Sequence, residues 1–284
     1  MKSYKKILVR LFTILPDPLY IKMVYYIKMK RKINLRNPKS YNEKLNWLKL
    51  HDRKIQYKKI VDKFEAKKYV AGLIGEKYII PTYGMWNHFD DIDFSALPEQ
   101  FVLKTTHDSG GVVIVRCKSE MEKEEAKKTI EESLNNNYFY LCREWPYKDL
   151  KHRIIAEEVI SETVPNDYKF FMFNGQMDSV MVCTDRVSGH PKYRFYDEKW
   201  SRLYYQKNEL EPKTDVEKPE NYEEMIEIAK KLSEGFVHVR VDLYNVSGNI
   251  FFGELTLFDQ GGFDTDITYD TDIYWGSKID LNRV

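Results

Sequence analysis

The spacing of apolar residues along the chain predicts alternating helices and strands. Helical spacing, with apolar residues three or four positions apart, occurs in residues 4–15, 18–31, 37–52, 61–75, 119–137 and 220–235. Runs typical of strands occur in residues 78–86, 101–106, 112–117, 152–160, 167–186 and 239–262. Ser40 followed by Glu43 marks a helix start, and Asn174-Gly175 marks a hairpin turn. Because hairpins alternate with helices, the pattern predicts an α+β fold.

The last segment, residues 239–262, predicts a hairpin that carries two carboxylates within apolar runs. Side chains alternate between the faces of a strand. Two groups of residues are therefore each expected to share a face: Arg240, Asp242 and Tyr244, and Phe252, Glu254 and Thr256. If Asp242 pairs with Glu254, the turn is Ser247-Gly248-Asn249, and both acids lie on one surface with Arg240.

Two like charges that face each other on a sheet repel, and a divalent cation between them would remove the repulsion. Mg²⁺ suits carboxylate oxygens and is usually shared with phosphates. The hairpin therefore favours a metal site at Asp242 and Glu254. The alternative is a solvated hairpin face on which Arg240 neutralises both acids.

Composition places the chain among globular proteins, with 43% hydrophobic and 31% charged residues in 284 and a net charge of +1. This balance argues against a nucleic-acid partner. The charge is unevenly distributed, because residues 1–36 hold ten basic residues and one acid. Residues 241–277, around the hairpin, hold seven acids and no lysine or arginine, which favours a cation there.

The N-terminus reads as a basic amphipathic helix rather than a signal peptide, since Arg10 interrupts its apolar core and no small-residue cleavage site follows. It either packs on the domain or contacts anionic lipid, through residues 1–36. No apolar run reaches the roughly 18 residues of a spanning helix. Three separated cysteines without a CxxC pair predict a reducing cytoplasm, so we expect a cytoplasmic protein, with the inner membrane face as the alternative location.

A glycine turn joins two predicted strands in "FVLKTTHDSGGVVIVR", residues 101–116. Backbone N–H groups of such a loop can approach phosphates, because no Cβ is in the way. Lys104, at the end of the first strand, would add a positive charge for phosphate oxygens. No GK[ST] follows, so the loop is not a Walker A motif, and an ordinary turn beside an exposed lysine remains the alternative.

Together and in this order, these segments resemble the ATP-grasp enzymes. More closely, "NPKSYNEKLNWLKLHD", "IIPTYG", "FVLKTTHDSGG" and "LYNVSGNIFFGELT" resemble the TupA-like ATP-grasp family of bacterial surface-polysaccharide gene clusters. The resemblance covers roughly residues 35–284. It implies two α+β subdomains that grip ATP, at residues 76–160 and 161–284, after a helical N-terminal region at residues 1–75.

The resemblance also implies roles for individual residues. Nucleotide contacts are expected from the phosphate-binding lysines, the closing loop, the adenine-binding hinge and a ribose-binding acid: Lys63 and Lys104; His107, Asp108, Ser109, Gly110 and Gly111; Glu157, Glu158 and Val159; and Asp167. Arg240, with Lys104, is expected to act on the transferred phosphoryl group. Metal ligands are expected at Asp242, Glu254 and Thr256, where Thr256 replaces the family's usual asparagine. Gly261 and Gly262 are expected to line the acceptor side.

The implied reaction is formation of an amide from a carboxylate and an amine through an acyl phosphate, with ATP and with Mg²⁺ or Mn²⁺. The expected substrate is a precursor of a surface polysaccharide. Two alternatives are a sugar kinase, which the same site could serve, and a glycosyltransferase that uses the two D-x-D sequences at residues 264–266 and 270–272.

Overall fold

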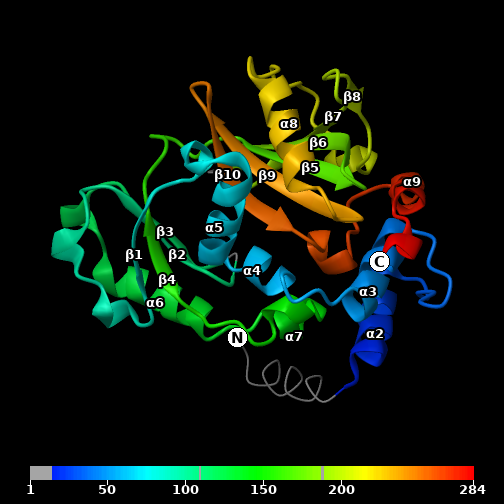
Figure 1. Ribbon diagram of the computed structural model, residues 1–284, viewed down its shortest axis with the longest axis horizontal. Coiled ribbons are helices and arrows are strands. Elements are labelled where there is room, and N and C mark those ends of the chain that lie inside the picture. The colour runs from blue at the N-terminus through cyan, green and yellow to red at the C-terminus, as the bar shows by residue number, and fades with distance from the viewer. Residues whose placement is uncertain (1–14, 109, 187–188) are drawn as a thin grey trace.

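The strands form two antiparallel sheets in this computed structural model, which describes residues 15–108, 110–186 and 189–284 (Figure 1). The four-stranded sheet has the order β1 (Thr82–Trp86), β4 (Ile154–Glu157), β2 (Phe101–Thr105) and β3 (Val112–Val115). The six-stranded sheet has the order β10 (Asn249–Thr256), β9 (His238–Val246), β5 (Asp167–Phe173), β6 (Gln176–Thr184), β7 (Lys192–Tyr196) and β8 (Arg202–Leu203). The predicted α+β class is confirmed.

The helices of the described residues are α2 (Asp17–Met29), α3 (Tyr41–His51), α4 (Tyr57–Val61), α5 (Lys63–Ile74), α6 (Lys123–Leu134), α7 (Phe139–Cys142), α8 (Tyr222–Leu232) and α9 (Tyr269–Lys278). Five of them, α2, α3, α5, α6 and α8, follow the predicted ranges closely, whereas α4, α7 and α9 were not predicted. Ser40 and Glu43 form the predicted capping box at the start of α3, and each accepts a hydrogen bond from the other's backbone N–H. The helix predicted over residues 4–15 lies almost entirely outside the described residues.

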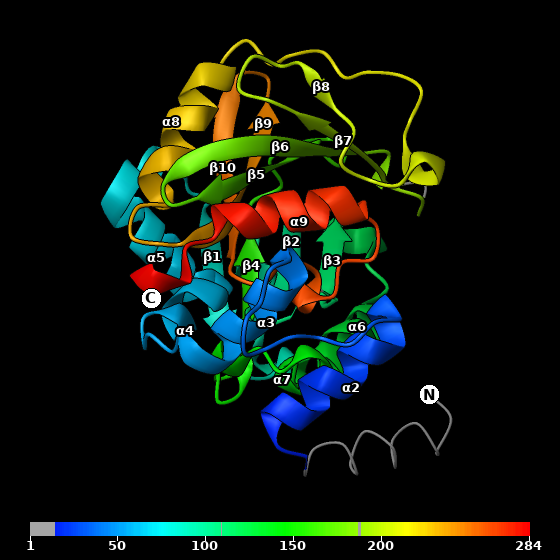
Figure 2. The same cartoon turned by 90° about the vertical axis from the view of Figure 1, so that its right-hand side faces the viewer.

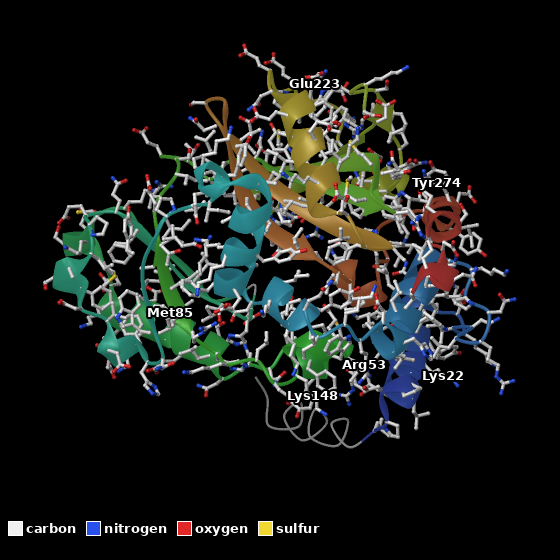
Figure 3. The ribbon with its side chains drawn as sticks, in the orientation of Figure 1. Lys22, Arg53, Met85, Lys148, Glu223 and Tyr274 are labelled. Carbon is white, nitrogen blue, oxygen red and sulfur yellow. The ribbon has the colours of Figure 1, made fainter. Side chains whose placement is uncertain are left out.

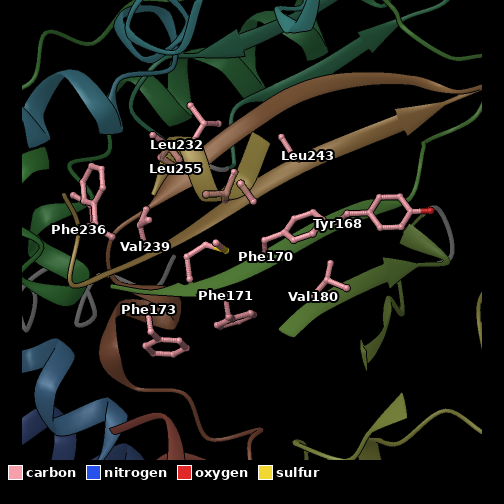
Figure 4. Close-up of a cluster of buried hydrophobic side chains, with 14 of the residues drawn as sticks. Tyr168, Phe170, Phe171, Phe173, Val180, Leu232, Phe236, Val239, Leu243 and Leu255 are labelled. Carbon is pink, nitrogen blue, oxygen red and sulfur yellow. The ribbon is translucent and has the colours of Figure 1, made fainter. Parts of the chain in front are cut away.

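The six-stranded sheet has one apolar face, which packs on α8 and α5. Phe170, Val241, Leu243 and Leu255 of this sheet are buried there with residues of α8 such as Leu232. Figure 4 shows part of this core, with Phe171 and Phe173 on the side of the sheet away from Leu232. Trp275 of α9 stacks on Phe171, with 4.4 Å between ring centroids. Figure 2 shows α9 between this sheet and the helices α3 and α2.

The β9–β10 hairpin differs from the prediction at its turn. Val246 pairs with Asn249, so the turn has two residues, Ser247 and Gly248, both with positive φ. A bulge at Gly253 then shifts the register by one residue, and Asp242 pairs with Glu254 as predicted. The bulge also moves Phe252 to the other face, where it pairs with Leu243 in the core. The expectation that Phe252 shares a face with Glu254 is therefore wrong.

The four-stranded sheet has a core of its own with α6, formed by Phe101, Leu103, Val115, Ile130 and Ile154. Figure 1 shows this sheet and α6 on the left, the six-stranded sheet and α8 at the upper right, and α5 between them. In Figure 3, Met85 of β1 marks the first group and Glu223 of α8 marks the second. The four-stranded sheet thus packs on α6, and the six-stranded sheet packs on α8 and α5 on one face and on α9 on the other.

Within the ranges that the structure describes, no helix is long and apolar enough to cross a membrane.

Candidate active site

A cavity of about 340 Å³ lies between the two sheets. Its wall includes Lys104 of β2 and Glu157 of β4 from the smaller sheet, and Asp242 of β9 and Glu254 of β10 from the larger. Eight residues predicted from the sequence line it: Lys63, Lys104, Glu157, Glu158, Val159, Asp167, Asp242 and Glu254. Residues almost 200 positions apart therefore meet in one place, which we call the first cavity.

Arg240 is the centre of a buried charge cluster in the larger sheet. Its guanidinium donates two hydrogen bonds to Asp242, at 2.7 and 2.8 Å, and one to Glu254 at 2.9 Å. A further bond goes to Asp259. Arg240 is only 8% exposed and Asp242 only 2%, so the face is buried rather than solvated. The two acids do not face each other unscreened, because Arg240 neutralises both, as the alternative reading of the hairpin had it.

Lys169 of β5 is a site residue that the sequence analysis did not single out. It lies opposite Asp242 in the register, its ammonium pairs with Asp242, and it lies 2.6 Å from a carboxylate oxygen of Asp167. Burial acts to raise the pKa of Asp242, but Arg240 and Lys169 outweigh it and lower this pKa to about 2. The available signal was the alternation in "DYKFF", which places Asp167 and Lys169 on one face of an apolar strand.

On the opposite wall, one carboxylate holds two lysines. The Glu157 side chain lies 2.6 Å from the ammonium of Lys104 and 2.5 Å from that of Lys67, which also donates to the Ile80 carbonyl. Burial acts to raise the pKa of Glu157, and the two lysines lower it overall. Glu157 thus positions the lysines through its side chain. One negative charge for two positive charges leaves this wall electropositive.

The glycine loop packs between α5 and α6. Lys63, the first residue of α5, donates through its side chain to the carbonyl of Asp108 and through its backbone to that of Thr106. Ser133 of α6 donates to the Asp108 carboxylate at 2.9 Å. His107 is buried and stacks on His152 at 3.5 Å. Ser109 lies outside the described residues.

The two glycines of the loop differ in their surroundings. A Cβ on Gly111 would come within 2.6 Å of the Thr105 hydroxyl and would also meet Ser133. A Cβ on Gly110 would meet nothing closer than the Asp108 carboxylate at 3.6 Å, and Gly110 is exposed. Close packing therefore requires glycine at position 111 and leaves position 110 free for the approach of a ligand.

A second cavity of about 240 Å³ adjoins the first, and Lys63, Gly253 and Glu254 line both. Its wall brings together residues of the loop, the helices and the sheet, among them His107, Tyr138, Glu144, Tyr147, Arg240, Thr256, Asp259 and Gln260. Thr256 donates to Glu254 at 3.0 Å. Gly261 and Gly262 follow directly, both with positive φ, in the turn Asp259–Gly262. The arrangement suits two ligands that meet at Glu254.

The two D-x-D sequences lie away from both cavities and have structural partners. Asp272 accepts hydrogen bonds from the backbone and side chain of Asn42, both at 2.9 Å, and pairs with Arg31. Asp264 accepts from the backbone of Asp266 at 2.8 Å. Both aspartates are buried, and neither lines the first or the second cavity. These contacts explain the aspartates without a nucleotide sugar.

A comparison with protein-family models matches residues 43–280 to the family described as TupA-like ATPgrasp. The chain belongs to this family. The family and the ATP-grasp enzyme class that were expected from the sequence are therefore confirmed. The two antiparallel sheets of this ATP-grasp protein confirm the expected fold. No curated protein matches the chain.

Among solved structures, the ATP-grasp chain is similar to D-alanine–D-alanine ligase from Helicobacter pylori, with a TM-score of 0.47 and 15% identity over 84% of this chain and 69% of that one. It is also similar to D-alanine–D-alanine ligase from Bacillus anthracis, with a TM-score of 0.46 and 16% identity over 79% and 63% of the two chains. A third similar structure is D-cycloserine synthetase DcsG, with a TM-score of 0.43 and 14% identity over 79% of this chain and 72% of that one. The family match, which spans most of the chain, is the basis of the assignment.

The first cavity fits ATP in two respects besides its lysines. The Oδ1 atom of Asp167 is buried and has no hydrogen-bond partner in the described part of the chain, so a ribose hydroxyl could donate to it. Next to Glu157, the backbone N–H of Glu158 donates to the Pro81 carbonyl, whereas that of Val159 has no backbone partner among the described residues. The first cavity therefore offers a carboxylate oxygen to the ribose of ATP and a backbone N–H to its adenine ring.

The carboxylates fit a metal ion that arrives with phosphates rather than a pre-formed metal site. Within the described ranges, no group of three or more His, Cys, Asp or Glu side chains is arranged to hold a metal. Asp242 and Glu254 are neighbouring oxygen donors on the cavity wall, and Mg²⁺ commonly combines one or two carboxylates with substrate phosphates. Thr256 lines the second cavity only, and its role as a ligand stays a prediction.

Proposed function

We propose that the protein is an ATP-dependent carboxylate–amine ligase that forms an amide on a precursor of a bacterial surface polysaccharide. The observation that supports this most is the junction of the two cavities at Lys63, Gly253 and Glu254. One cavity has the charges for a nucleotide and the other has room for acceptors beside it. We propose a polysaccharide precursor as the substrate because the TupA-like family, which the sequence resembles, belongs to gene clusters for surface polysaccharides.

In this proposal the lysines and Arg240 carry the first step. Lys63 and Lys104 hold the phosphates of ATP, and Arg240 faces the phosphoryl group as it moves to the substrate carboxylate. Asp242 and Glu254 would hold Mg²⁺, which neutralises charge on the β- and γ-phosphates when bound. Because the chemistry needs no protein nucleophile, positioning and charge stabilisation supply the rate.

Product analysis tests the proposal directly. The full-length protein is incubated with Mg-ATP, with glucuronate, galacturonate or L-glutamate as carboxylates, and with glucosamine or L-glutamate as amines. ADP, phosphate and an amide in equal amounts support a ligase. ADP with a phosphorylated sugar and no phosphate means a kinase, and a nucleoside diphosphate released from a nucleotide sugar means a glycosyltransferase. Glu254→Gln, at a carboxylate whose side chain is 44% exposed, is the matched inactive control.

A second proposal concerns peripheral contact with an anionic membrane through residues 1–36. On α2, Leu19, Tyr26 and Ile27 are each more than half exposed and Lys22 is exposed, and the exposed Lys30 follows directly after the helix. Exposed apolar residues interleaved with lysines suit the interface of an anionic bilayer. Residues 1–14, which carry much of the predicted basic helix, lie outside the described residues.

Vesicle sedimentation tests this contact, since each basic residue near an anionic surface contributes about 1 kcal/mol, screened by salt. Binding to phosphatidylserine vesicles at low salt, lost at high salt and on deletion of residues 1–15, supports it. Equal binding to neutral phosphatidylcholine vesicles contradicts the electrostatic part. Unfolding on deletion identifies the segment as a structural helix instead.

A further inference from the structure

One buried acid in the second cavity lacks the partners that its neighbours have. Glu144 follows α7 and is 4% exposed, yet its carboxyl has no hydrogen bond or salt bridge within the described ranges. By contrast, Glu254 and Asp259 in the same wall both pair with Arg240. A buried carboxyl without a partner is costly to the fold and therefore points to a ligand that supplies one.

The surroundings of Glu144 are built around its position. Lys49 of α3 is fully buried and donates to the carbonyls of Cys142 and Gly261, at 2.7 and 2.6 Å. Gly261 has φ +61, and a Cβ there would lie 2.6 Å from the Cys142 sulfur and 3.4 Å from a Glu144 carboxyl oxygen. Lys49 and Gly261 thus pack beside the Glu144 carboxyl but form no hydrogen bond or ion pair with it in the described part of the chain.

The charges of the second cavity favour a cation. The acids Asp108, Glu144, Glu254 and Asp259 line it, against the cations Lys63 and Arg240, of which Arg240 is already shared among three carboxylates. Tyr138 and Tyr147 also line it. A protonated amine matches this wall better than a second carboxylate does.

We infer that the second cavity binds the amine substrate and that Glu144 is the catalytic residue that holds its ammonium and takes its proton. This inference rests on the proposed ligase function. The Glu144 carboxylate accepts one proton from the ammonium, and the freed amine attacks the carbonyl carbon of the acyl phosphate. The C–N bond forms, the C–O bond to phosphate breaks, and phosphate leaves with the electron pair and accepts the second amine proton.

The ionisation of Glu144 agrees with this role. Burial raises the pKa of its carboxyl to about 8; Asp259 and Glu254 contribute to the rise, while Lys49 and Arg240 oppose it. Cys142, Tyr138 and Tyr147 also face this carboxyl, and its charge acts to raise the pKa of each. A carboxyl whose pKa lies close to that of an amine can exchange a proton with it at little cost.

Hydroxylamine separates the two steps, because it is largely unprotonated at neutral pH and traps an acyl phosphate without a base. With Mg-ATP and a carboxylate from the set above, we expect Glu144→Gln to form hydroxamate within about twofold of wild type. With glucosamine or L-glutamate as the amine, we expect amide formation to fall at least 100-fold, within the usual range for loss of a general base. The loss should shrink as pH rises, because more of the free amine is then unprotonated. Glu132→Gln, on the exposed face of α6, is the matched control.

The outcomes distinguish the inference from the proposed function. No hydroxamate from the wild type with any carboxylate overturns the ligase proposal, and the inference with it. Equal loss of hydroxamate and amide in Glu144→Gln, or loss of neither, overturns the role of Glu144 alone. Hydroxamate without amide from the wild type contradicts an amine pocket at this position. Glu144→Asp, which keeps the carboxyl, should recover part of the amide activity.

Discussion

Arg240 binds Asp242 through two hydrogen bonds along a single strand, and Lys169 reaches the same carboxylate from the next strand. The acid is thus a counter-ion for two buried cations as well as a predicted metal ligand. The sequence suggested that Asp242 and Glu254 repel each other on this face. In the structure both acids instead balance the charge of buried cations.

We therefore expect Asp242→Asn to abolish turnover and also to lower the free energy of unfolding, by about 3–5 kcal/mol, because removal of one partner leaves buried charge uncompensated. Urea denaturation and ATP turnover measure the two effects. Asp270→Asn, an exposed acid on α9, should change stability by less than about 1 kcal/mol. An Asp242→Asn protein that melts at or above the wild-type temperature would contradict this account of the cluster.

Lys104 is held at the first cavity by Glu157, at 2.6 Å, in a position to meet phosphate oxygens. We expect Lys104→Ala to weaken ATP binding by about 1.5–3 kcal/mol, the usual contribution of a hydrogen bond to a charged group. Titration calorimetry with Mg-ATP measures the change. Lys59→Ala, on an exposed position of α4, is the control and should bind ATP as the wild type does. Unchanged affinity in Lys104→Ala would place the phosphates elsewhere.

The two glycines of the loop should respond differently to alanine. Gly111→Ala forces a Cβ against Thr105 and Ser133, so we expect it to lower the free energy of unfolding by about 1–3 kcal/mol. Gly110→Ala has room for its Cβ and should cost less than about 0.5 kcal/mol. Thermal denaturation of the pair compares them directly. Any loss of ATP turnover in Gly110→Ala then reports on the ligand and not on the fold.

Acid should destabilise the protein through His238. Burial lowers the pKa of this ring to about 3, assisted by Arg240, while the Met172 carbonyl and Asp178 oppose the shift; its other ring nitrogen lies 2.9 Å from the Tyr41 hydroxyl. In the unfolded chain this imidazole binds a proton near pH 6.5, whereas in the folded chain it binds one only near pH 3. The contribution of the neutral His238 ring to the free energy of unfolding is therefore complete above pH 6.5 and is lost progressively as the pH falls toward 3.

Urea denaturation between pH 7 and pH 5 tests this dependence in wild type and in His238→Gln, which cannot take up the proton. We expect the stability gap between them to narrow by roughly 1–2 kcal/mol over this range, since one group contributes at most about 1.4 kcal/mol per pH unit. His88→Gln, at an exposed position, should show a constant gap. A gap for His238→Gln that stays constant with pH would mean that the ring takes up its proton with the same pKa in the folded and unfolded chains.

The local features of the fold were available in the sequence, because they depend on near neighbours. The spacing of apolar residues determined α3, α5, α6 and α8, and the box of Ser40 and Glu43 determined where α3 begins. Alternation along β9 and turn residues at Asn174-Gly175 determined the hairpins. The pairing of Asp242 with Glu254 was also predictable, although the bulge at Gly253 that produces it was not.

Only the tertiary structure decided which charges meet. Lys169 reaches Asp242, and Lys67 reaches Glu157, because separate strands and helices pack side by side, and no spacing in the sequence encodes that contact. Nothing in the sequence distinguishes Glu144 from other acids in loops; its burial results from the packing of α3 and of the turn after β10 around it. Periodicity follows from bonds between adjacent residues, whereas burial and charge pairing follow from the packing of elements that are distant in the chain.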